Sequence, residues 1–496
     1  MECPAGFSFT PLKGGPLAAV TEHLTAGQRF LFWDYDITWS DNHMRASELE
    51  PYRMMGDPLA DNALEALGIK HGQDAYEALV AYTSRPIEEQ ADDAPRKFME
   101  SVTTVPSWVD WSKIQQGQAV HCALLHFSLA GGFNLPKISK VLTSTGYLAG
   151  DKTKYRVLET AQFVVDVMQT PDSLKPETGA AWKSIIQVRF LHAQVRQKLS
   201  RLSKAHSKYY NVQEYGVPIN QEDMSGTLYS FSAVVWKVME ERMGVAMTRQ
   251  EQEDYLHVWR YIGYIMGVDP VFDPASSVDR ANAILESIIL HLTDPSHSGG
   301  QLCAGLLHSM HGSSSSLLRP DPYKLHMAMA EFLLGPQVWS LMGHAPTSLY
   351  YRVLKRLILR LLHLDLWSVS KMPRWWFRAR FSIILWLQNR AIRAELGSKR
   401  TNFALSKEPK VLPHDLAGLS PGPGSPPVGH LSKTESSASA TKASWQSRAL
   451  LTTFSVAVLV IAARNRKHQR TVALLPRLPK MLDHTLMRFV SPFLLS

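Results

Sequence analysis

The sequence predicts an all-α fold, and three observations support this class. Apolar residues recur three, four and seven positions apart through most of the chain, as on one face of a helix. No strand-type alternation of apolar and polar residues is sustained. The GxGxxG, Walker A and GxSxG motifs of α/β enzymes are absent, and so is the HExxH zinc motif.

Composition narrows the class of protein further. The 496 residues suffice for one large core or for two to three domains. The net charge is +9, and the basic residues concentrate after residue 350, which favours an acidic lipid surface as partner. No zinc finger or aromatic RNA-binding motif is present, so we expect no nucleic-acid partner. Cys3, Cys122 and Cys303 lie far apart, which argues against a disulfide framework or a thiolate zinc site.

The first half of the chain supplies a lead-in to the core. Residues 1–45 carry the aromatic run RFLFWDYDITW, which is ordered but not clearly helical, and no convincing signal peptide. Residues 46–345 are predicted to form one helical domain. Asp57 and Pro58 are typical of a helix start, whereas Pro86 and Pro95 interrupt the helical pattern.

Two histidines in the apolar stretch that follows are weak metal candidates. His121 and His126 are five residues apart, a poor fit to one metal on one helix face, so core or surface roles are favoured. A helix is then predicted from Asp151 to Met168.

That helix carries a polar patch. Arg156 and Thr160 lie one turn apart, with Glu159 beside them. From spacing alone, a solvated charged patch is the favoured interpretation.

The central feature is the predicted helix over residues 182–200, with Pro176 and Glu177 expected near its first turn. His192 lies within its apolar face, which also carries Ile185, Val188, Val195 and Leu199. Arg189 and Arg196 lie close to the same side. A neutral imidazole can be an axial iron ligand, and guanidinium groups suit carboxylates such as haem propionates. From spacing alone, a hydrogen-bonded core histidine is the favoured interpretation of His192, and ordinary salt bridges are the alternative for the two arginines.

Two more helix starts are marked by polar residues. Asn220 to Asp223 crowd the first, where capping is favoured over a contact with substrate, and Thr248 caps the second. His257 lies off the best apolar face of the second helix.

The C-terminal part is predicted in three segments. Residues 346–400 form basic amphipathic helices, with Arg352 and Trp375 among the residues that suit either a membrane surface or a solvated helix face. Residues 401–447 have the composition of a disordered linker. Residues 448–496 include the apolar run 449–463, which is shorter than the roughly 20 residues of a membrane-spanning helix, so a tail anchor stays open.

Several motifs occur together in a consistent order between residues 50 and 275. They are SWVDWSKIQQGQ, YRVLETAQF, RFLHAQVR, GVPINQEDMSGTLYSFS and YLHVWRYIGYIMGV. This ordered set resembles the catalytic domain of the rubber-oxygenase (latex-clearing protein) and fungal MpaB-type oxygenase family. The resemblance implies a globin-related helical bundle around haem b, with His192 as proximal iron ligand and Arg156 and Thr160 on the distal side.

The resemblance also implies an activity. The family uses O2 to cleave carbon–carbon double bonds in isoprenoid chains, so a haem oxygenase acting on a lipophilic alkene is expected. A membrane-associated place, at the endoplasmic reticulum, and a part in specialised metabolism go with this reading. One residue departs from the pattern, because Glu159 stands where rubber-cleaving members have a lysine. Glu159 is therefore a candidate base. The alternatives are peroxidase or hydroxylase chemistry on the same fold, and a non-catalytic membrane-surface protein.

Overall fold

The computed structural model describes most of the chain between residues 18 and 370. The described residues are 18–32, 35–69, 73–119, 140, 141, 144, 151–207, 210–242, 244, 246–273, 277–295, 297–309, 320–370, 386, 388–390, 392, 393, 396, 401 and 403. His121, His126, the predicted segment 448–496, and the linker 401–447 apart from Thr401 and Phe403 lie outside them.

Helices form most of the described structure, so the predicted all-α class is confirmed. The N-terminal helices are α1 (Ala18–Thr21), α2 (Ala46–Arg53), α3 (Pro58–Leu67), α4 (Ala75–Thr83), α5 (Ala94–Thr103) and α6 (Trp111–Ala119). The central helices are α9 (Asp151–Val167), α10 (Ala180–Ala205), α11 (Val212–Tyr215), α12 (Gln221–Phe231), α13 (Ala233–Lys237) and α14 (Arg249–Met266). The last are α15 (Val278–Leu292), α16 (His297–Ser309), α17 (Pro322–Leu334), α18 (Pro336–Leu341) and α19 (Leu349–Ser370).

One short hairpin interrupts the helical pattern. The strands β1 (Arg29–Phe32) and β2 (Tyr35–Thr38) pair antiparallel, with Arg29 opposite Thr38. Phe30 and Phe32 alternate inward and pack near Leu290 of α15. Strands of four residues are too short to give a sustained alternation, so the sequence pattern did not indicate this hairpin.

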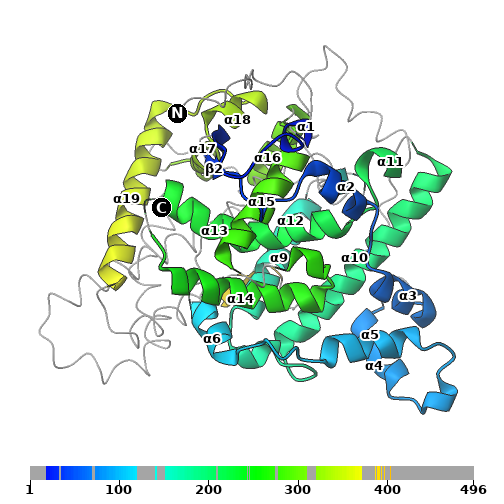
Figure 1. Cartoon of the computed structure of the whole chain (residues 1–496). Helices are drawn as coiled ribbons and strands as arrows, with labels where there is room; N and C mark the ends of the chain where they lie inside the picture. The colour runs from blue at the N-terminus through cyan, green and yellow to red at the C-terminus, as the bar shows by residue number, and fades with distance from the viewer. Residues whose placement is uncertain are drawn as a thin grey trace, which may run out of the picture.

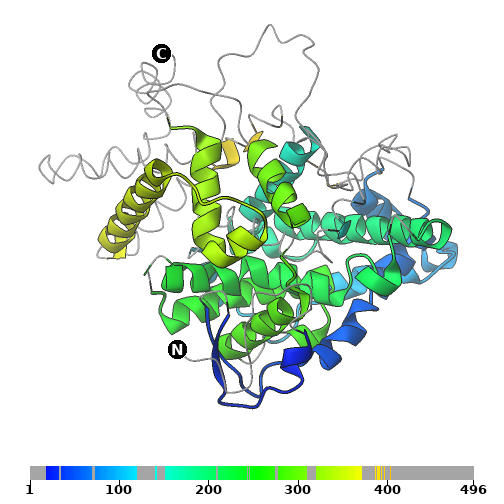
Figure 2. The ribbon, with the colours of Figure 1, turned by 90° about the horizontal axis from the view of Figure 1, so that it is seen from above.

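Helix α10 is the longest element and crosses the molecule diagonally, with α3, α4 and α5 at its lower right (Figure 1). It packs against α3, α4, α9 and α14. Its apolar face enters the main core through Trp182, Ile185, Ile186 and Phe190, all fully buried. The view from above shows α19 at one edge of the molecule (Figure 2), where it packs on α17.

Local signals placed several helix starts correctly. Asp57 caps α3 by accepting the Ala60 N–H, with Pro58 in the first turn. Asn220 caps α12 and Thr248 caps α14, as predicted. The start of α10 was predicted wrongly: the helix begins at Ala180, because Glu177 has a positive φ of 61° that cannot continue a helix.

Candidate functional site

His192 lies at the middle of α10 with one ring nitrogen unsatisfied. Burial, and secondarily the charge of Arg196, lower the pKa of the His192 imidazole to about 4. The ring is therefore neutral at neutral pH and keeps a free lone pair. Its Nδ1 atom is buried and has no hydrogen-bond partner among the described residues. A buried polar atom without a partner costs about 1–3 kcal/mol. A group that bound this nitrogen would therefore stabilise the folded protein.

Arg189, one turn before His192, is fully engaged by protein groups. Its Nε and Nη2 donate to the two oxygens of Asp57 at 2.7 and 3.0 Å, and its Nη1 donates to the Ile265 carbonyl at 2.8 Å. Gly267 lies against this guanidinium, since a Cβ there would approach Nη2 to 2.5 Å. These contacts tie α10 to α3 and α14, which is the ordinary ion pairing left open by the sequence.

Arg196, one turn after His192, has a donor to spare. Its Nε donates to both oxygens of Asp61, at 2.9 and 2.7 Å, and its Nη1 donates to the Ile219 carbonyl. The Nη2 atom is buried without a hydrogen-bond partner in the described part of the chain. A buried guanidinium N–H that lacks an acceptor suits an anionic group. The two arginines that looked alike in the sequence are thus different.

The polar residues of α9 contact one another as the spacing suggested. Arg156 Nη1 donates to Glu159 Oε2, and the Thr160 hydroxyl donates to the Arg156 carbonyl at 3.1 Å. Glu159 is only 4% exposed, so a solvated patch is not what the structure contains. Burial raises the pKa of the Glu159 carboxyl, which Arg156 and a hydroxyl from Thr401 counteract. Helix α9 packs on α10, the helix that carries His192.

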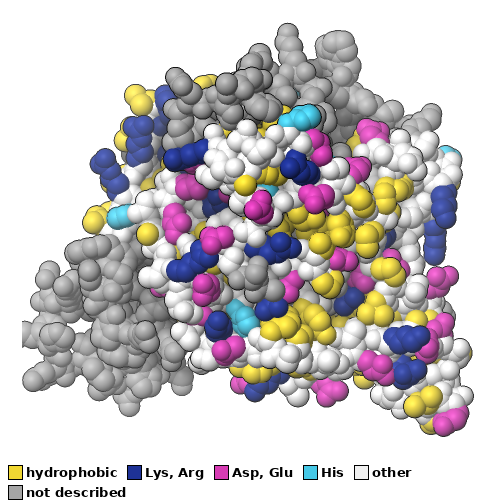
Figure 3. Space-filling model, viewed as in Figure 1, with side chains coloured by type: hydrophobic (Ala, Val, Ile, Leu, Met, Phe, Trp, Pro, Cys, Tyr) yellow, Lys and Arg dark blue, Asp and Glu magenta, His cyan; other side chains and the backbone are white. Residues whose placement is uncertain are grey.

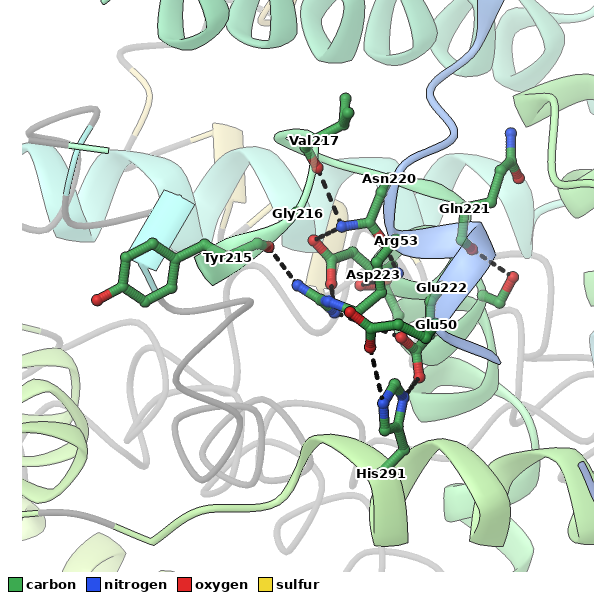
Figure 4. A network of polar contacts seen from close by, with 12 residues as sticks. Glu50, Arg53, Tyr215, Gly216, Val217, Asn220, Gln221, Glu222, Asp223 and His291 are labelled. Atoms are coloured by element: carbon green, nitrogen blue, oxygen red, sulfur yellow. Dashed lines mark hydrogen bonds and ion pairs between the residues drawn. The ribbon is translucent and has the colours of Figure 1, made fainter. Parts of the chain in front are cut away.

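A buried polar network that the sequence did not reveal joins α2, α12 and α15 (Figure 4). Arg53 donates to Glu222 at 3.3 Å and to Asp223 at 3.4 Å. His291 contacts Glu222 at 2.7 Å and Glu50 at 3.1 Å. Asn220 to Asp223 had been recognised as capping residues only, because Arg53 and His291 lie far away in sequence and give no local signal.

Other hydrogen bonds of this network are donated to backbone carbonyls, so they hold the fold together. Arg53 also donates to the Tyr215 carbonyl, and Gln221 donates to the Gly56 and Gly267 carbonyls at 2.8 and 3.1 Å. The network therefore fixes the start of α12 beside the turn between α2 and α3. Arg196 of α10 donates to the Ile219 carbonyl, just before α12. This hydrogen bond connects the helix that carries His192 to the start of α12.

The α10 residues fit a haem better than a multi-ligand metal ion. No group of three or more histidine, cysteine or acidic side chains with metal-ligand spacing occurs in the described ranges. A haem iron needs only one protein ligand on its proximal side, and a neutral buried imidazole is suitable. His192 has a neutral imidazole with a buried, unpartnered Nδ1, and one turn away Arg196 has a buried N–H without an acceptor among the described residues.

Comparison with known proteins supports an oxygenase. The model of the family described as "ER-bound oxygenase mpaB/B'/Rubber oxygenase, catalytic domain" matches residues 73–363, which is more than half of the chain. The chain belongs to this family. A rubber oxygenase from Streptomyces sp. (strain K30) is 28% identical over 367 residues, covering 70% of this chain and 84% of that protein. A solved structure of latex clearing protein LCP in the closed state has a TM-score of 0.47 and 23% identity, over 69% of this chain and 90% of that chain.

Membership confirms the family resemblance and the prediction of an oxygenase enzyme. The match begins at residue 73, inside the 50–275 range in which the motifs were found, and continues past the end of that range to residue 363. The domain boundaries and the roles of individual site residues remain predictions.

Proposed function

We propose that this oxygenase is haem-dependent and that His192 is the proximal ligand of the iron. The observation that carries this proposal is the buried, unpartnered Nδ1 of a neutral imidazole at the centre of α10. Arg196 would hold a haem propionate through Nη2, whereas Arg189 holds the helix in place. When bound, the haem supplies the iron at which O2 is activated.

The proposed reaction is oxidative cleavage of a carbon–carbon double bond in a lipophilic isoprenoid or prenylated substrate, in specialised metabolism. Support comes from the family and from the relative that is named a rubber oxygenase. Arg156 and Thr160 lie on a helix that packs on α10, where a guanidinium and a hydroxyl could donate hydrogen bonds to developing negative charge. The buried carboxylate of Glu159 would act as a base and accept a proton.

Haem binding is tested by absorption spectroscopy with a matched histidine control. Protein produced with added haem precursor should show a Soret band, and His192→Ala should lose it. His257→Ala removes another buried histidine, whose pKa is also lowered to about 4, and should keep the band. A colourless wild type, or an unchanged band in His192→Ala, would refute the assignment.

The reaction type is tested with a prenylated phenol or a terpene under isotopically labelled O2. Carbonyl products at the former double bond should carry the label. Label found only in a hydroxyl group, or peroxide-dependent turnover without O2, would instead support hydroxylase or peroxidase chemistry.

We also propose that α19 binds an anionic membrane surface, at the endoplasmic reticulum as the family description suggests. No helix in the described ranges is long and apolar enough to cross a membrane. Helix α19 nevertheless exposes Leu349, Val353, Leu357 and Leu364 by 67, 54, 53 and 58%.

The exposed side of α19 combines these apolar residues with positive charge. Arg352, Arg356 and Arg360 are exposed on it, and basic and hydrophobic side chains alternate at the edge of the molecule where α19 lies (Figure 3). The other side packs on α17, where the Lys355 ammonium lies 4.5 Å from the centre of the Phe332 ring. An apolar face bordered by arginines suits a headgroup layer.

Vesicle sedimentation tests this surface. Wild-type protein should sediment with phosphatidylserine vesicles more than with phosphatidylcholine vesicles, and Leu357→Glu should reduce the bound fraction severalfold. Ile87→Glu is the control, since Ile87 is 68% exposed outside α19. Equal losses in the two variants, or no binding by wild type, would refute the role of α19.

A further inference from the structure

Two residues that follow the range matched by the family pack directly onto α9. The family match ends at residue 363, yet Thr401 and Phe403 are 8 and 4% exposed. The Thr401 hydroxyl donates to Glu159 Oε1 at 2.6 Å, and the Thr401 N–H donates to Gln162 Oε1 at 3.2 Å. Phe403 packs edge-on to Phe163, with ring centroids 6.4 Å apart. Phe403 therefore contributes to the same core as Phe163 of α9.

The backbone at this contact is shaped around the threonine hydroxyl. The Phe403 N–H donates to Thr401 Oγ1 at 3.1 Å, so the hydroxyl accepts one hydrogen bond while it donates another. Phe403 has a φ of 52°, in the left-handed region that residues other than glycine rarely adopt. Such a conformation persists where surrounding contacts impose it, here the ring packing and the hydrogen bond.

Each oxygen of Glu159 is held by a different part of the chain. Arg156, on the same helix, donates to Oε2, and Thr401 donates to Oε1. Arg156 is the charged side chain that contacts this carboxylate among the described residues. With both oxygens bound, the orientation of the carboxylate is fixed about its terminal torsion. A buried carboxylate with one donor removed would be free to rotate and would lose part of the stabilisation of its charge.

We infer that Thr401 is a positioning residue for Glu159, so that the C-terminal segment at 401–403 is a working part of the oxygenase site. This inference rests on the proposed function, because Glu159 matters for the reaction only if α9 faces the haem. It deepens that function by adding to the site a residue that lies after the range matched by the family's catalytic domain, residues 73–363. Arg156 sets one oxygen locally, and Thr401 sets the other from about 240 residues away in sequence.

The test compares Thr401→Val, which keeps the shape and removes the hydroxyl, with Thr401→Ser, which keeps the hydroxyl. Thr401→Ala is the second hydroxyl-free variant if valine impairs folding. Infrared difference spectra of the full-length protein, titrated with acid, would follow the carboxyl stretch, and Glu159→Gln would assign the band. Removing one hydrogen bond to the charged form should raise the titration midpoint of Glu159 by about one pH unit, a tenfold change in proton affinity. Thr401→Ser should restore the wild-type midpoint.

Turnover provides the second measurement. Thr401→Val should lower kcat about tenfold with KM little changed, and serine should restore it. An unchanged Glu159 band in both hydroxyl-free variants, even with reduced thermal stability, would overturn the inference. If the protein binds no haem but the band shifts, the proposed function fails while the link between Thr401 and Glu159 stands. If turnover is normal and the band does not move, the proposed function stands while the link between Thr401 and Glu159 fails.

Discussion

Helices α10 and α14 present nearly the same set of side chains with one difference. Each carries a histidine whose pKa is lowered to about 4, chiefly by desolvation, and an arginine three residues away. Arg189 pairs with Asp57 and lies 4.8 Å from the Phe98 ring. Arg260 pairs with Asp273 and lies 3.6 Å from the Trp108 ring.

The difference is in the histidine's partner. On α14, His257 Nε2 accepts the Asp110 N–H at 2.9 Å, so this imidazole caps a turn within the protein. On α10, the buried Nδ1 of His192 has no such partner in the described structure. A depressed pKa therefore does not identify a ligand by itself, because both histidines have one. The unsatisfied nitrogen is the distinguishing feature.

The largest effect on the free energy of unfolding should come from Arg189, and a much smaller one from Arg260. Arg189→Leu leaves Asp57 buried without its counter-ion and should lower the free energy of unfolding by about 3–5 kcal/mol. Arg260→Leu removes a pair whose side chains are 15 and 28% exposed, and should cost about 1 kcal/mol. Urea unfolding followed by circular dichroism measures both. Equal losses would mean that α10 is not held more firmly than α14.

Much of this comparison was accessible from the sequence, but its decisive part was not. Helical spacing placed His192 on an apolar face between Arg189 and Arg196, and local capping signals at Asn220 and Thr248 were read correctly. Spacing cannot say which arginine nitrogens are already bonded, since Asp57 and Asp61 lie more than 130 residues before α10's arginines. The contact of Thr401 with Glu159 could not be predicted for the same reason. Residues 401–447 have the composition of a disordered linker, and composition does not indicate that one of them packs on α9.

The pH dependence of the free energy of unfolding should report on the two histidines. A folded-state pKa of about 4 lies below the unfolded value of 6.5, so the unfolded chain takes up protons that the folded chain refuses. Stability is therefore full above pH 6.5 and falls as the pH drops toward about 4. Each histidine should account for at most about 3 kcal/mol of that fall in haem-free protein.

Single leucine variants check this window. The free energy of unfolding, measured by denaturant titration at several pH values, should fall less steeply between pH 6.5 and about 4 in His192→Leu and in His257→Leu than in wild type. A slope that neither variant changes would show that both rings protonate freely in the folded state.

The same two variants differ in a smaller effect at neutral pH, and this difference tests the unsatisfied nitrogen directly. His257→Leu removes the acceptor of the Asp110 N–H and should destabilise haem-free protein by about 1–3 kcal/mol. His192→Leu removes a nitrogen that has no partner, so its cost should stay below about 1 kcal/mol and could turn into a gain. Adding haem should then stabilise His257→Leu and wild type but not His192→Leu, because ligand binding to the folded state alone raises its stability. A His192→Leu protein that is as destabilised as His257→Leu, and that haem still stabilises, would place the iron ligand elsewhere.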